Sequence, residues 1–238
     1  MNTTIAAITL RAMVGRRRAV LLLAMPVILL GLAVALRLTG VAGVGTSRAV
    51  LGAFALGTLV PLLGLIIGTG VIGPEIDDGS IVYLLAKPVS RFVIVFTKLV
   101  VAVGCVAVFA AVPTLAAGLI MAGDRRGLAL GYGVGALVGG AVYCAVFLML
   151  GVLTRHAVVV GLLYALLWES LIGGYVPGAR TLSVRQWAVS VTSAVAEHGA
   201  VPADVRLRVA VPLLLVAAVA ATWYAGWRLR SLALTSDE

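Results

Sequence analysis

The segment Gly73–Lys98, GPEIDDGSIVYLLAKPVSRFVIVFTK, separates two long apolar runs and is rich in charged residues. These residues are Glu75, Asp77, Asp78, Lys87, Arg91 and Lys98. If the segment continued an apolar run through a membrane, each of its carboxylates would cost roughly 2.5–3.5 kcal/mol near the bilayer centre. We therefore expect the segment to lie in water, between two membrane-spanning helices.

A short helix over residues 80–87 is predicted within this segment. Its apolar residues Ile81, Leu84 and Leu85 recur at positions i, i+3 and i+4, which places them on one face. Pro88 ends the helix, because the residue before a proline is disfavoured in helical conformation. A helix this short cannot span a bilayer. Two interpretations remain: a simple loop joining two spans, or a docking helix whose apolar face fits a groove on a soluble partner.

The pattern E-x-x-x-G-S-I-V-Y-L-L-A-K-P-V-S-R begins at Glu75 and resembles the loop after the second span of type 2 ABC-transporter permeases. In that family the loop forms the coupling helix, which contacts a separate ATPase subunit. The resemblance implies that residues 79–91 form such a helix on the cytoplasmic side. The residues that it assigns to ATPase coupling are Glu75, Gly79, Ile81, Tyr83, Leu84, Leu85, Lys87, Pro88 and Arg91.

The composition is that of an integral membrane protein. The chain has 238 residues, of which 62% are hydrophobic and 11% charged, and its mean hydropathy is +1.16. A soluble domain of this length could not bury so much apolar surface. The formal net charge of +9 does not indicate nucleic-acid binding, because the basic residues stand mainly at the ends of apolar runs.

The apolar runs predict an all-α integral membrane protein with a single permease domain, residues 1–238. Six transmembrane helices are expected, at about residues 19–36, 50–72, 92–122, 128–153, 157–172 and 209–227. Ser183 and Gln186 form a capping-box pattern. It predicts an amphipathic helix between the fifth and sixth spans, which we expect on the outer surface or capping the bundle.

Orientation follows from the basic cluster Arg16–Arg18, which should keep the N-terminus inside by the positive-inside rule. With six spans, both termini are then cytoplasmic, and we expect a multi-pass protein of a bacterial plasma membrane. Basic residues followed by an apolar run and Ala33–Ala35 also fit a cleavable secretory signal. The run of about 18 apolar residues favours a retained anchor instead.

Small residues within the spans predict close helix packing. Gly131, Gly135 and Gly139 recur at i+4 on one face of the fourth span, and Gly64 and Gly68 do so in the second. Such stripes let two helix backbones approach closely. For the fourth span we prefer helix–helix contact to the alternative, a pore lining.

Ionisable residues within spans are functional candidates by default. Glu169 lies in the fifth span beside Trp168, and we expect it nearer the outer surface than the midplane. Its carboxylate either anchors the structure by pairing with Arg180 or Arg185, or contacts cargo in the translocation path. Lys98, in the first turns of the third span, is expected to extend its amine to the cytoplasmic headgroups.

No catalytic motif is present: the sequence has no glycine-rich phosphate loop with Lys-Ser/Thr and no H-E-x-x-H. His156 and His198 are expected on opposite sides of the membrane, so we predict no metal site, and no cofactor on this chain. The resemblance implies that ATP and Mg bind to a partner ATPase. Two ATPase copies would work with this chain and a second permease, in a homodimer or a paralogous heterodimer, in the lipid bilayer and without nucleic acid.

Two other functions are compatible with an apolar multi-span chain. An ion-gradient-driven secondary transporter would place ionisable residues near the bilayer midplane, often on broken helices. A membrane-anchored assembly factor would not transport anything. An ATPase that co-purifies with the chain would separate the ABC permease, which we take to be an exporter, from both alternatives.

Overall fold

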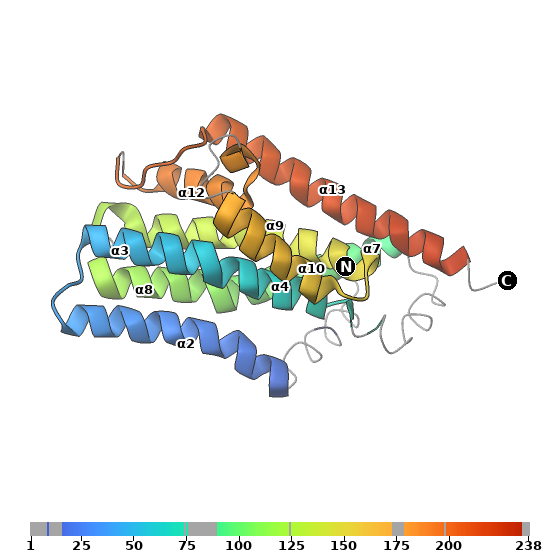
Figure 1. Ribbon diagram of the computed structural model, residues 1–238, viewed down its shortest axis with the longest axis horizontal. Helices are drawn as coiled ribbons and strands as arrows, with labels where there is room; N and C mark the ends of the chain where they lie inside the picture. The colour runs from blue at the N-terminus through green and yellow to red at the C-terminus, as the bar shows by residue number, and fades with distance from the viewer. Residues whose placement is uncertain are drawn as a thin grey trace.

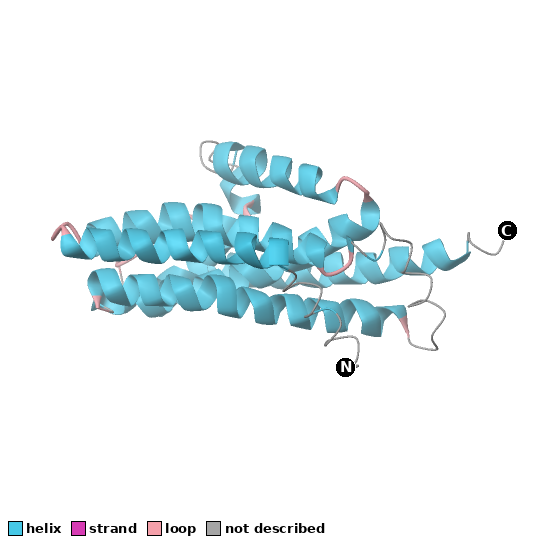
Figure 2. Ribbon diagram, turned by 90° about the horizontal axis from the view of Figure 1, so that it is seen from below, coloured by secondary structure: helices cyan, strands magenta, loops and turns pink. Residues whose placement is uncertain are grey.

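The computed structural model describes Thr9 and residues 16–73, 75, 90–123, 125–172, 179–197 and 199–234. Every regular element in these residues is a helix, and the long helices run lengthwise in one elongated bundle (Figures 1 and 2). The predicted all-α fold is therefore confirmed for the part of the chain that the structure describes.

The first half of the bundle consists of α2, α3, α4 and the π-helical η1, followed by α7, η2 and α8. Their bounds are α2 Arg16–Leu38, α3 Val44–Val50, η1 Leu51–Leu59, α4 Val60–Gly70, α7 Arg91–Val106, η2 Ala107–Ala111 and α8 Val112–Ala122. Two π-helical segments end just before a proline, Pro61 in one case and Pro113 in the other. A proline cannot donate to the carbonyl four residues earlier, and the wider π turns accommodate that loss within continuous helices.

The second half is built around α9, which packs against α4, α8, α12 and α13. Its elements are η3 Arg125–Gly127, α9 Leu128–Leu153, α10 Ala157–Leu163, η4 Tyr164–Ile172, η5 Ala179–Leu182, α12 Val184–Val195 and α13 Leu207–Leu234. The α8–α9 turn needs left-handed backbone at Gly123 and Gly127, and Arg126 adopts it too, with φ 60°. This tight turn makes α8 and α9 an antiparallel hairpin.

Among the residues that the structure describes, five helical stretches are long and apolar enough to cross a membrane: Val20–Leu38, Val44–Gly70, Arg91–Ala122, Leu128–Leu153 and Leu207–Arg230. They correspond to five of the six predicted spans. The predicted fifth span, 157–172, differs, because its apolar helix Ala157–Glu169 is shorter than the others.

The chain after α9 passes from one end of the bundle to the other in two pieces. Helix α10 with η4 forms the first piece, and α12 forms the second, lying lengthwise beside α9 (Figure 1). The backbone N–H of Glu197, just after α12, donates to the carbonyl of Arg126 in the α8–α9 turn at 3.0 Å. Helix α12 therefore ends level with that turn. This helix, which the sequence predicts on the outer surface or capping the bundle, packs lengthwise against α9, whose small residues leave room for it.

Three glycines of α9, at positions 131, 135 and 139, face α12. A Cβ at Gly131 would lie 2.9 Å from the carbonyl oxygen of Thr192, and one at Gly139 would lie 2.8 Å from the Cβ of Ala188. At Gly135 an added Cβ would overlap the Thr192 side chain. On another side of α9, Gly64 and Gly68 of α4 lie against Tyr143 and Phe147. Backbones at such separations tolerate no side chain between them.

We predict that Gly135→Leu displaces α12 and lowers the midpoint of thermal unfolding in detergent. Overpacking of a dense contact costs about 1–3 kcal/mol or more. Gly104→Leu is the matched control, because nothing lies within 4 Å of a Cβ at Gly104. Equal midpoints for the two variants would contradict the close packing of α9 against α12.

Candidate functional site

Lys98 lies in the second turn of α7 with its side chain fully buried. Its Nζ donates to Oε1 of Glu75 at 2.7 Å and also to the backbone carbonyl of Val71. The expectation that the amine extends to the headgroups was wrong. The Lys98 ammonium binds the Glu75 carboxylate and the Val71 carbonyl inside the protein, so it does not need to reach water or lipid headgroups.

The position of this ammonium has a physical reason. Val71 is the C-cap of α4, and the last carbonyls of a helix lack partners and carry the negative end of its dipole. Lys98 satisfies one of these carbonyls and pairs with Glu75, whose side chain is 23% exposed. A buried cation is costly unless it is paired and hydrogen-bonded, as it is here. The ion pair therefore fastens the end of α4 to α7, and we call Lys98, Glu75 and the Val71 carbonyl the clamp.

The clamp lies beside described residues that flank the predicted coupling segment. Glu75 is the first of the predicted coupling residues, and Arg91, the last, is the half-buried first residue of α7. Ser90 takes the N-cap position of α7, although its side chain makes no capping hydrogen bond. The other predicted coupling residues, Gly79, Ile81, Tyr83, Leu84, Leu85, Lys87 and Pro88, lie outside the described residues.

Glu169 is 1% exposed and lies in the last turn of η4. Its carboxylate accepts hydrogen bonds from the Tyr164 hydroxyl (3.1 Å), the Ser183 hydroxyl (2.5 Å) and the backbone N–H groups of Val184 (3.0 Å) and Arg185 (3.3 Å). Ser183 is the N-cap of α12 and accepts from the N–H of Gln186, as the capping-box pattern predicts. The carboxylate thus completes the N-terminus of α12, where the helix dipole favours negative charge.

The depth of Glu169 differs from the prediction. Ala188 of α12 lies beside Gly139, in the middle of α9, and Ser183 comes five residues earlier on an antiparallel path. At 1.5 Å per residue this places Glu169 about 7 Å farther from the α8–α9 turn than Gly139. Glu169 is therefore near the middle of the bundle rather than near one surface. The prediction placed Glu169 too near the outer surface, because no pattern in the sequence indicates that α12 continues the path of α10 and η4 along α9.

Arg185 does not use its guanidinium to pair with Glu169. Its Nη2 donates to the carbonyl of Gly52 at 3.2 Å, and its Cζ lies 3.1 Å from where a Cβ of Gly57 would be. Close by, the Tyr132 hydroxyl donates to the carbonyl of Arg48 at 3.3 Å. The side chain of Arg180, the other predicted partner, lies outside the described residues. Sequence reasoning missed Tyr132 and Tyr164, since an aromatic residue in an apolar run gives no sign of its hydroxyl partner.

The described residues bring no three His, Cys, Asp or Glu side chains together in a way that could hold a metal ion. Two buried charged side chains of the described bundle, Lys98 and Glu169, lie at helix ends. The clamp holds the C-terminus of α4, and Glu169 holds the N-terminus of α12.

Removing one member of the clamp should be costly. We expect Lys98→Met to lower the free energy of unfolding by about 3–5 kcal/mol, because it leaves a partly buried carboxylate without its cation. The double variant Lys98→Met/Glu75→Leu should recover part of that loss, and thermal unfolding in detergent measures both. Arg155→Gln, in the exposed turn after α9, is the control for loss of one positive charge. Additive losses in the double variant would refute the clamp.

Replacing Glu169 by Gln should destabilise α12, because the amide has one accepting oxygen and no charge for the helix N-terminus. Charge-assisted hydrogen bonds contribute about 1.5–3 kcal/mol each, so we expect a clearly lowered unfolding midpoint. Ser183→Ala should lower it too, and the two effects should combine less than additively. Glu197→Gln, exposed at the other end of α12, is the matched control. Wild-type stability of Glu169→Gln would show that the carboxylate does not anchor α12.

Comparison with known proteins adds the family. The family model for ABC-2 family transporter proteins matches residues 48–175, which is more than half of the chain's 238 residues. The match begins in the last turn of α3 and includes η1, α4, the clamp, α7, α8, α9, α10 and η4. A comparison with curated proteins gave no match. The resemblance seen in the sequence is confirmed, and the chain belongs to the ABC-2 family of transporter proteins, the multi-pass membrane permeases of ABC transporters.

Proposed function

We propose that the chain is the membrane subunit of an ATP-driven ABC exporter, coupled through residues 79–91 to a separate ATPase. Family membership implies association with an ABC ATPase. In the proposed assembly two ATPase copies bind ATP and Mg, and this chain pairs with a second permease copy, identical or paralogous. The chain itself then supplies the translocation path and hydrolyses nothing.

The proposed topology has six crossings, five continuous and one in two pieces. Arg37, at the end of α2, donates to the Met121 carbonyl near the end of α8 at 3.4 Å, so α2 ends level with the α8–α9 turn. Phe92, at the start of α7, contacts Trp223 and the Arg230 guanidinium in the C-terminal half of α13. The C-terminal half of α13 therefore lies at the bundle end where α4 ends and α7 begins, and α2 starts toward the same end (Figure 1). By the positive-inside rule we assign this end to the cytoplasm of a bacterial cell.

The observation that carries the proposal is the clamp. Glu75, the first of the predicted coupling residues, is bound to Lys98 of α7, beside the last carbonyls of α4. A displacement of the segment by the ATPase would thus act on α4 and α7 together. Since α4 packs closely on α9, the displacement would reach the centre of the bundle. Closure of the ATPases could then shift a two-state membrane domain through its differential binding free energy.

The secondary-transporter alternative now has one observation in its favour, because Glu169 lies near mid-bundle on a broken crossing, where coupling ions bind in such proteins. Both carboxylate oxygens, however, already accept hydrogen bonds from protein donors. An anchoring role accounts for all four of these contacts. Together with the family, this favours an ABC permease in which Glu169 shapes the translocation path by holding α12.

The coupling assignment predicts loss of the ATPase when the apolar face of residues 80–87 is charged. Leu84→Asp/Leu85→Asp should abolish co-purification of the ATPase in detergent, because an exposed apolar cluster of this kind is a typical partner surface. Arg91→Gln should weaken co-purification less, since a charge at the rim of an interface mainly changes the association rate.

Arg155→Asp, in the α9–α10 turn at the same bundle end, is the control for a new carboxylate on this side. Cysteine labelling should show the same topology in all variants. A doubly charged variant that retains its ATPase at full stoichiometry would disprove the coupling assignment.

A further inference from the structure

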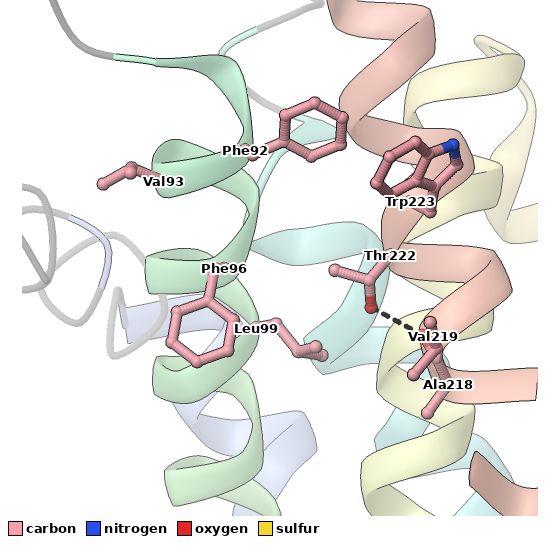
Figure 3. A pocket seen from close by; sticks show the side chains of 8 residues that line it. All are labelled: Phe92, Val93, Phe96, Leu99, Ala218, Val219, Thr222 and Trp223. Carbon is pink, nitrogen blue, oxygen red and sulfur yellow. Dashed lines mark hydrogen bonds between the residues drawn. The ribbon is translucent and has the colours of Figure 1, made fainter. Parts of the chain in front are cut away.

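An apolar groove lies between α7 and α13 near the ends where Phe92 and Trp223 meet (Figure 3). Its volume is about 530 Å³, and its walls include Phe92, Phe96, Leu99, Val219 and Trp223. The hydroxyl of Thr222 also faces it, but donates to the carbonyl of Ala218 at 2.6 Å. The groove therefore offers almost no free hydrogen-bonding group, and its lining suits a hydrocarbon chain.

A second apolar hollow, of about 560 Å³, lies on the other flank of α13. Val219 and Trp223 line both hollows and are 64% and 65% exposed, so they form a ridge between the two. The lining of the second hollow, which includes Leu215 and Tyr224, belongs entirely to α13. The two apolar hollows on either side of this ridge suit the two acyl chains of a single phospholipid.

A basic residue stands at one end of the two hollows. The guanidinium carbon of Arg230 lies 4.6 Å from the centre of the Phe92 ring, which is itself 5.1 Å from the ring of Trp223. Arg230 is seven residues beyond Trp223, or about 10 Å along the helix. Stacking occupies the flat face of a guanidinium and leaves its N–H edges free to bind a phosphate. Arg230 is exposed and makes no hydrogen bond with the described residues.

The charge and the aromatic residues around the hollows indicate how deep this surface lies in a membrane. Neither α7 nor α13 contains an Asp or Glu, so the local charge is positive. Trp223, Tyr224 and Trp227 are all exposed, as in the aromatic belts that mark a membrane interface. Arg230, one turn beyond them, is then at the level of lipid phosphates.

We propose that α7 and α13 form a binding site for one anionic phospholipid. Its phosphate binds at Arg230, and its acyl chains fill the hollows on either side of Val219 and Trp223. Assignment of this lipid to the cytoplasmic leaflet, where anionic lipids attract basic segments, rests on the proposed topology. The site itself does not depend on that orientation.

Quenching of tryptophan fluorescence by brominated lipids tests the proposal. The full chain is reconstituted in symmetric bilayers that contain brominated phosphatidylglycerol or brominated phosphatidylcholine at equal mole fraction. Subtracting the signal of Trp223→Phe gives the contribution of Trp223. We expect the anionic lipid to bind about fivefold more strongly than the zwitterionic one, the factor that one basic residue near an anionic headgroup provides. Arg230→Gln should remove this preference.

Arg208→Gln is the matched control, because Arg208 is exposed at the opposite end of α13. Ala218→Phe fills the first hollow and should reduce quenching by both lipids. Equal quenching by the two lipids in the wild-type protein, or an unchanged preference in Arg230→Gln, would overturn the proposal. Absence of quenching in the wild-type protein, together with disulfide cross-linking of a Trp223→Cys variant to a second copy, would also overturn it. No ATPase is present in this experiment, so its failure is distinct from failure of the coupling assignment.

Discussion

Backbone-to-backbone contact along α9 is the constraint on which the other helices depend. In a bilayer, apolar side chains gain little by leaving lipid for protein, so association relies on close packing. Helix α9 presents Gly131, Gly135 and Gly139 to α12, while α4 presents Gly64 and Gly68 to α9. Because both contacts involve the same helix, α4, α9 and α12 form one closely packed unit. The more peripheral α2 and α13 expose most of their apolar residues.

The two buried ionisable groups obey a common electrostatic rule. The Lys98 ammonium lies at the C-terminus of α4, where helix carbonyls are negative, and the Glu169 carboxylate lies at the N-terminus of α12, where N–H groups are positive. Each charge satisfies helix-end groups that would otherwise need water or another polar partner. The clamp thereby holds the C-terminal end of α4, and Glu169 holds the N-terminus of α12 within the bundle.

The clamp and Glu169 lie at different levels of the bundle, and each is linked to α9 through a different helix, α4 and α12 respectively. The clamp connects the predicted coupling segment to α4 and α7, and Glu169 connects the broken crossing to α12. Both α4 and α12 pack on the glycines that keep α9 close. In the proposed function, a displacement on the ATPase side would reach the middle of the bundle through these closely packed helix contacts, which are hard to compress.

Sequence alone was enough for the features that depend on composition and local spacing. The apolar runs predicted six spans, and five of them correspond to continuous helices in the described residues. Ser183 and Gln186 predicted the start of α12, and the segment that begins at Glu75 indicated the family. The division of the path after α9 into α10 with η4 and then α12 could not be predicted, since periodicity shows that a helix is amphipathic but not which face of another helix it covers. The partners of Lys98 and Glu169 were likewise beyond reach. Lys98 meets a carboxylate 23 positions earlier, and Glu169 meets the start of a helix 14 positions later. Only the packing of α4, α7, α9 and α12 brings these groups together, because a buried charge takes whichever opposite helix end the tertiary fold places beside it.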